Sequence, residues 1–198
     1  MVELIKAMEA GDRDTRIKIA KALGVLEDKR ATEPLIRALD DEDKEVRHEA
    51  VYALHAIADV RAFETYVRLL SDEDWLLRSW AAMGLGSLGD VRAVGPLLQS
   101  FSDEDEVVRG AVASSLGDIG EGVAVSALID ALCDGEWSVR RSAALALGKI
   151  GDDRAVEPLM LLQEDENLGV QYTAALGIRM IGGDDVRGCS GGCCRIPR

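Results

Sequence analysis

The sequence has no long apolar stretch and no excess of basic residues. No segment approaches the roughly 18 apolar residues that a membrane span requires. The opening, MVELIKAMEAGD, carries acids where a secretory signal would be apolar. Lys and Arg number 23 against 36 Asp and Glu, a formal net charge of −13. Because nucleic-acid affinity depends on clustered Lys and Arg, we expect no nucleic-acid partner. Because the sequence shows neither a membrane span nor a secretory signal, we expect no membrane partner and a cytoplasmic protein.

Cysteine is scarce and unevenly placed. Cys133 stands alone, whereas Cys189, Cys193 and Cys194 lie close together near the C-terminus. A disulfide framework spreads its cysteines over a small secreted domain, so this pattern favours a reducing compartment. The terminal cluster lacks the paired C-x2-C spacing of zinc sites. We therefore expect no metal and no other cofactor, and we expect residues 186–198 to form a mobile Gly/Cys-rich tail.

What the sequence does contain is a repeat of 31 residues. Segments of similar pattern begin with Ala at positions 31, 62, 93, 124 and 155, and residues 1–30 fit one more unit that lacks its first position. Searching for such a period first matters because a missed repeat gives the wrong fold. The repeat predicts one domain over 1–185, built from the units 1–30, 31–61, 62–92, 93–123, 124–154 and 155–185.

Each unit shows the pattern of two helices. The first helix has an early Pro in three units, where a missing N–H is tolerated, and an acidic turn follows it. The second helix carries an apolar stripe at helical period, such as Leu77, Ala81 and Leu85, and in four units a Gly such as Gly89 marks its end. A unit of this size cannot bury its stripe alone, so the units must stack. The predicted fold is all-α, a right-handed α-solenoid of six two-helix repeats.

The recurring pattern A-V-x-P-L-x-x-A-L-x-D-x-D-x-x-V-R-x-x-A-A-x-A-L-G-x-I-G-D resembles the HEAT-like repeat of the phycobilisome-lyase type. The resemblance covers about residues 1–185. It implies a HEAT-like solenoid, and the family it points to includes scaffolds, chromophore lyases and hydroxylases.

One column of the repeat is basic and another is acidic. The basic column holds Arg16, Arg47, Arg78, Arg109 and Arg140, and the acidic column, four residues earlier, holds Asp12, Asp43, Asp74, Asp105 and Glu136. A guanidinium bonds one carboxylate in its own unit and one in the next, so we expect a structural ladder that fixes the stacking angle. Phosphate binding by an arginine cluster is the less favoured alternative, because each Arg is matched by an acid.

The columns that vary between units lie opposite the apolar stripe of the second helix, and the resemblance implies that they line a concave groove. They contain residue types that are enriched at interface hot spots. We expect the binding surface to consist of His48, Tyr52, Trp75, Leu76, Trp80, Met83, Trp137, Arg141 and Tyr172. The alternative is that these rings lie over the next unit's helix as additional core.

Catalytic patterns are weak. The segment RHEAVYAL resembles the iron-binding His-Glu helices of deoxyhypusine hydroxylases, but such a site needs several pairs, and His48-Glu49 occurs once. His48 and His55 stand about 10.5 Å apart along a helix, too far to share one metal easily. We expect no catalytic residues and a scaffold or adaptor that binds another protein or peptide. A chromophore lyase-like role, with a bilin stacked on Trp75 and Trp80, is the alternative.

An iron hydroxylase is the least favoured function. The apolar Leu161 and Leu162 in the last unit raise the further possibility of a homodimer through the terminal unit.

Overall fold

The computed structural model of the chain describes residues 1–182, and within this range the regular secondary structure is all helical, with no strand. Short 3-10 helices and turns join the longer helices. The expected Gly/Cys-rich tail, residues 186–198, lies outside the described residues.

Twelve α-helices alternate in two kinds over residues 1–182. The first helices of the units are α1 (Val2–Ala10), α3 (Thr32–Ala38), α5 (Phe63–Leu69), α7 (Val94–Gln99), α9 (Val125–Ala131) and α11 (Val156–Leu161). The second helices are α2 (Arg13–Leu26), α4 (Lys44–Ile57), α6 (Trp75–Leu88), α8 (Glu106–Ile119), α10 (Trp137–Ile150) and α12 (Leu168–Gly182). The second helices begin 31 residues apart, which confirms the predicted array of six two-helix units.

The ends of the second helices follow from local chemistry. Asp74 and Asp105 occupy N-cap positions, where their carboxylates accept hydrogen bonds from backbone N–H groups of the first turn. Gly89, Gly120 and Gly151 follow the helices in the left-handed conformation, with φ between 62° and 79°. Ala58 and Glu27 adopt the same conformation at the ends of α4 and α2 without the freedom of glycine.

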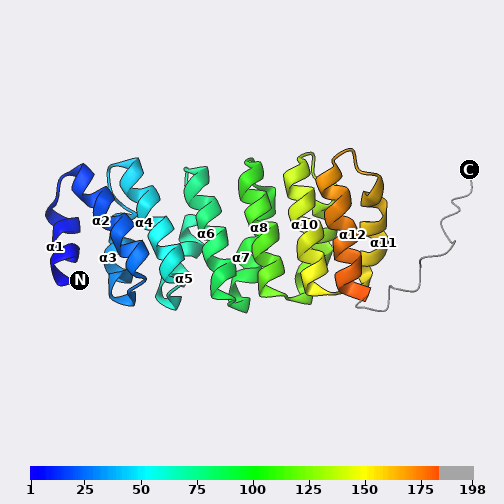
Figure 1. Ribbon diagram of the computed structural model, residues 1–198, viewed down its shortest axis with the longest axis horizontal. Coiled ribbons are helices and arrows are strands. Elements are labelled where there is room, and N and C mark those ends of the chain that lie inside the picture. The colour runs from blue at the N-terminus through cyan, green and yellow to red at the C-terminus, as the bar shows by residue number, and fades with distance from the viewer. Residues whose placement is uncertain (183–198) are drawn as a thin grey trace, which may run out of the picture.

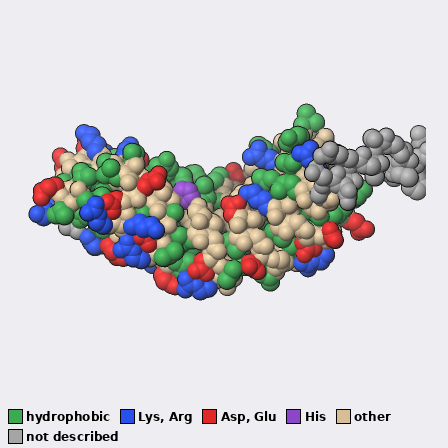
Figure 2. Space-filling view, turned by 60° about the horizontal axis from the view of Figure 1, so that its bottom comes forward, with side chains coloured by type: hydrophobic (Ala, Val, Ile, Leu, Met, Phe, Trp, Pro, Cys, Tyr) green, Lys and Arg blue, Asp and Glu red, His purple; other side chains and the backbone are tan. Residues whose placement is uncertain are grey.

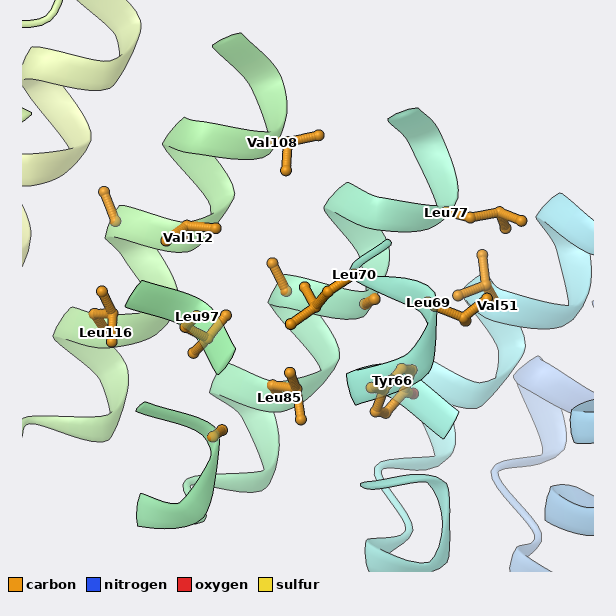
Figure 3. Packing of buried hydrophobic residues seen from close by; sticks show 14 of the residues in the cluster. Val51, Tyr66, Leu69, Leu70, Leu77, Leu85, Leu97, Val108, Val112 and Leu116 are labelled. Carbon is orange, nitrogen blue, oxygen red and sulfur yellow. The ribbon is translucent and has the colours of Figure 1, made fainter. Parts of the chain in front are cut away.

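The helices form two layers, and the units follow one another along an elongated body (Figure 1). The space-filling view shows that this body is curved and hollowed along one long edge (Figure 2). Leucine and valine side chains from both layers fill the space between them, as Figure 3 shows for Leu85, Leu97 and Leu116. Each unit thus buries its apolar stripe against its own first helix and against its neighbours.

Close approach of neighbouring second helices depends on one glycine column. A Cβ built on Gly117 of α8 would lie 2.6 Å from the Cα of Ala146 in α10, and one on Gly148 would lie 2.7 Å from the Cα of Gly177. Gly86 of α6 has the same relation to Ser115 in α8. Because no side chain separates them at these points, the helices touch backbone to backbone.

The junction between α4 and α6 departs from this rule. His55 occupies the glycine column in α4, and its imidazole lies between the two helices, against Trp80. Helices α4 and α6 pack less closely than the other neighbouring second helices do. In the core beneath them, Tyr66 stands where the other units have leucine (Figure 3). Its ring lies over Gly84, and a Cβ built on that glycine would be 2.5 Å from the Tyr66 Cζ. The Tyr66 ring, which is larger than leucine, therefore fits because Gly84 has no side chain.

None of the helices described in residues 1–182 has the length and apolar character needed to cross a membrane.

Candidate functional site

We use "second-helix face" for the surface formed by the varying columns of the second helices: Tyr52, Trp75, Trp80, Met83, Trp137, Arg141 and Tyr172. Tyr52 is 51% exposed, Trp75 42% and Trp137 45%, and Met83, Arg141 and Tyr172 are also exposed. Large aromatic side chains that a monomer leaves this open are uncommon when they stand near one another. Trp80 and Leu76 are half-buried, so the alternative of additional core applies to them in part.

Three rings form a cluster across α4 and α6. The Tyr52 and Trp80 rings meet edge to face, with centroids 5.2 Å apart, and the His55 ring lies 5.1 Å from that of Trp80. Burial lowers the pKa of His55, which favours the neutral imidazole. Its Nδ1 is buried and has no hydrogen-bond partner, as is also true of the Tyr66 hydroxyl. The cluster thus combines the open aromatic surface of Tyr52 with a buried His55 nitrogen that has no hydrogen-bond partner.

His55 was not among the predicted binding residues. Its signal in the sequence was its position, since it replaces a glycine that four other units keep.

A second aromatic group lies on α10 and α12. The guanidinium of Arg141 stands 5.6 Å from the centre of the Trp137 ring, within the range of a cation–π contact. Tyr172 occupies the Arg141 position in the next unit and is widely exposed. Between the two aromatic groups, α8 presents small side chains at the positions of Arg141, Trp80 and Met83, namely Gly110, Ala111 and Ser114.

His48 is held by its neighbours rather than presented outward. Its Nε2 lies 2.7 Å from Oδ2 of Asp74, the N-cap carboxylate of the following unit, and Lys44 Nζ lies 3.4 Å from the same oxygen. The imidazole therefore links α4 to the start of α6. Among the residues that the structure describes, no group of three His, Cys, Asp or Glu side chains converges as metal ligands would.

The arginine column forms a ladder, but with other carboxylates than expected. Arg78 donates from Nε and Nη2 to both carboxylate oxygens of Asp103, at 2.7 and 2.9 Å. Its Nη1 donates to the carbonyl oxygens of Asp72 and Glu73 in its own unit. The same bidentate arrangement joins Arg109 to Asp134 and Arg140 to Asp165, and Arg16 is paired with Asp41. Each rung therefore fastens one unit to the next.

The acids predicted for the ladder have a different role. The carboxylates of Asp43, Asp74 and Asp105 cap the second helices by accepting hydrogen bonds from backbone N–H groups of the first turn, and the acids of the ladder stand two residues earlier. The sequence-based assignment of these partners was wrong because helical spacing alone does not show which way a carboxylate in a turn points. Asp43 also accepts a bond from Arg13, and Asp74 from His48.

Arg47 is the exception in the arginine column. Its Nη1 donates to the carbonyl oxygens of Asp41 and Glu42, but among the described residues it forms no ion pair with Asp72. The missing rung falls at the α4/α6 junction, where His55 separates the helices.

The ladder also sets the charge state of its acids. Hydrogen bonds from Arg109 hold the pKa of Asp134 below its usual value, and those from Arg140 do the same for Asp165, in both cases against the opposing effect of burial. Both carboxylates are therefore ionised at neutral pH, and their charges are matched inside the fold.

A row of exposed carboxylates remains along the edge where the second helices begin. Glu73, Glu104, Glu106 and Glu136 are exposed, and none forms an ion pair among residues 1–182. Glu106 is the first residue of α8, at the position that Trp75 holds in α6 and Trp137 in α10. This edge of the second-helix face therefore presents tryptophan rings and free carboxylates side by side.

Comparison with known proteins identifies the repeat. The sequence profile of HEAT repeats matches residues 1–65, 64–136 and 96–179. The chain belongs to the HEAT-repeat family. No curated protein sequence matches it closely enough to count as a relative.

Several solved structures share the fold of this chain. An engineered protein is 23% identical, with 91% of this chain and 95% of that chain covered and a TM-score of 0.71. The complex of CpcE and CpcF of phycocyanin lyase from Nostoc sp. PCC7120 is 23% identical, with 91% and 76% covered and a TM-score of 0.70. A designed armadillo repeat protein in complex with the peptide (KR)4 is 20% identical, with 90% and 98% covered and a TM-score of 0.69. At these identities, the likeness concerns the fold.

Proposed function

We propose that this HEAT-repeat protein is an interaction scaffold that binds a partner protein or peptide on its second-helix face. The observation that carries the proposal is the exposure of Tyr52, Trp75 and Met83 beside the half-buried Trp80, on neighbouring helices of a rigid array. Aromatic side chains and methionine contribute most to binding when a partner excludes water from them.

Two further observations support a binding role. The ladder and the glycine contacts fix α6, α8 and α10 relative to one another, and His48 joins α4 to Asp74 at the start of α6. The surface is therefore organised before a partner arrives, which lowers the entropic cost of binding. Repeat arrays of this fold also carry partners elsewhere: one similar structure is a complex with a peptide and another is a complex of two lyase subunits.

The test is affinity capture from the source cell, followed by identification of the retained proteins and measurement of their dissociation constants. The variant Trp75→Ala/Trp80→Ala should weaken binding of a specific partner at least tenfold, since two hot-spot side chains are removed. A matched control is Val60→Ala/Val91→Ala, which removes exposed apolar side chains from the 3-10 helices that precede α5 and α7. If both double variants retain the partner equally, the proposed face is not the binding surface.

A chromophore-handling role is the second candidate, because the same tryptophan rings offer flat apolar surface to a bilin and because one similar structure is a phycocyanin lyase complex. Titration of the purified protein with a bilin separates the two functions. A shift of the bilin absorbance that disappears in the Trp75→Ala/Trp80→Ala variant would favour this second role.

A further inference from the structure

The edge of the second-helix face carries a strong and uneven charge. In the segments 71–79, 102–110 and 133–142, nine carboxylates stand against four arginines. Three of these arginines, Arg78, Arg109 and Arg140, already form ion pairs with the acids of the ladder. The fixed negative charge on this edge is therefore carried by groups that the fold leaves without a salt bridge, chiefly Glu73, Glu104, Glu106 and Glu136.

The tryptophan rings at the same edge can also bind a cation. Trp75 and Trp137 stand at the first position of α6 and α10, with Glu106 at the equivalent position of α8 between them. A tryptophan face attracts a guanidinium or an ammonium group. The described part of the molecule contains one such contact, Arg141 over Trp137, and a second cation–π contact at 4.3 Å between Arg92 and the Phe63 ring.

We propose that the partner segment bound at this edge is a cationic, extended polypeptide, whose Lys or Arg side chains lie between the tryptophan rings and the free carboxylates of α6, α8 and α10. This inference rests on the proposed function and adds the chemistry of the partner. A negatively charged segment would meet four unpaired carboxylates and only one exposed arginine, Arg141.

The repeat also sets the spacing of the cations. Packed helices stand about 8–10 Å apart, and an extended chain advances about 3.3 Å per residue. Cations that serve neighbouring units are therefore about three residues apart, and about six residues span the distance from Trp75 to Trp137.

The direct test is fluorescence anisotropy with labelled peptides and the full-length protein. The probe is RSTRSTRST, with arginine at every third position. The controls are the charge-reversed ESTESTEST and RRRSTSTST, which has the same composition but clustered arginines. We expect the probe to bind, the clustered peptide to bind about tenfold more weakly, and the acidic peptide not to bind. The affinity for the probe should fall as the salt concentration rises, since screening weakens exposed charge pairs. Equal binding of all three peptides would overturn the proposal.

Two charge-matched variants separate local from overall electrostatics. Glu73→Gln/Glu106→Gln/Glu136→Gln removes three charges from the edge, whereas Glu33→Gln/Glu64→Gln/Glu157→Gln removes three exposed charges from one column of the first helices. The first variant should weaken the probe about tenfold or more and the second by less than about twofold. An equal loss in both would show that net charge alone attracts the peptide, and the proposed site would be wrong.

Trp75→Ala/Trp137→Ala should weaken the probe about tenfold, whereas Arg141→Ala should leave it unchanged or bind it more tightly, because a competing cation is removed. Loss of probe binding on Arg141→Ala would contradict a cationic partner.

Failure of this inference is distinguishable from failure of the proposed function. A captured partner that depends on Trp75 and Trp80 but is indifferent to salt and to the triple glutamine variant of the edge would overturn the cationic partner and leave the binding face standing. A partner retained by Trp75→Ala/Trp80→Ala would count against the face itself.

Discussion

The α8/α10 junction and the α4/α6 junction join equivalent helices in different ways. At α8/α10, Gly117 brings the backbones into contact and Arg109 pairs with Asp134. At α4/α6, His55 keeps the helices apart and Arg47 forms no ion pair with the next unit among the described residues. The first junction is held by backbone contact and a partly buried ion pair, and the second by packing of aromatic rings and by the bonds of His48 and Lys44 to Asp74.

The difference shows that one repeat makes two kinds of contact between units. Where the repeat is kept, neighbouring second helices meet through the glycine column and the ladder. Where it is broken, aromatic rings reach the second-helix face, and the Tyr66 hydroxyl and His55 Nδ1 stay unsatisfied. The irregular junction is thus the part of the array that borders the candidate binding surface.

The ladder offers the largest expected effect. Arg109→Met should destabilise the protein by about 3 kcal/mol, because it leaves the partly buried Asp134 carboxylate without its partner. Arg47→Met should cost about 1 kcal/mol, since only hydrogen bonds to carbonyl oxygens are lost. Urea unfolding followed by circular dichroism measures both. Equal losses would mean that the two junctions do not differ in the way described.

The glycine column gives the next effect. Gly117→Ala places a Cβ 2.6 Å from the Ala146 Cα, so the helices must shift, and we expect a net loss of about 2 kcal/mol despite the better helix propensity of alanine. Gly95→Ala in α7 is the control, because a Cβ there meets nothing within 4 Å, and it should be neutral or slightly stabilising. Thermal unfolding of the two variants measures the difference; a neutral Gly117→Ala would show that the backbone contact is not required.

Removal of the Tyr66 hydroxyl tests the packing beneath the α4/α6 junction. Tyr66→Phe deletes a buried hydroxyl that has no hydrogen-bond partner, and the ring keeps its place over Gly84. We expect a gain of up to about 1 kcal/mol in the free energy of unfolding, because the desolvation penalty disappears. A loss of stability would indicate that the hydroxyl has a partner in solution.

The smallest expected effect is a pH dependence of the folding stability that arises from His55 at the α4/α6 junction. Burial lowers the pKa of His55 in the folded state, so below pH about 6.5 the unfolded chain binds more protons at this residue and the folded state loses stability. The loss should begin as the pH falls through that range and should be absent in His55→Ala, measured by chemical denaturation at several pH values. The ladder acids Asp134 and Asp165, whose pKa values are lowered, should contribute a separate loss only below pH about 4. A pH dependence unchanged in the His55 variant would assign the first transition to another group.

The sequence by itself determined the repeat, the helix pairs and the apolar stripes, because 31-residue spacing, helical periodicity and capping residues are local properties of the chain. The columns that vary between units also predicted the exposed positions of Tyr52, Trp75 and Trp137, whereas Trp80, in another such column, packs partly against the core. The HEAT-like resemblance agrees with the family to which the chain belongs.

Only the tertiary structure decided which acid each arginine meets and what His55 does. Asp103 and Asp105 are two residues apart in one turn, and which of them faces Arg78 depends on the orientation of that turn against the preceding unit. A histidine in a glycine column shows its consequence only when the neighbouring helix is in place. Contacts between units are non-local, so the one-dimensional pattern defines the units while the three-dimensional stack defines how they are joined.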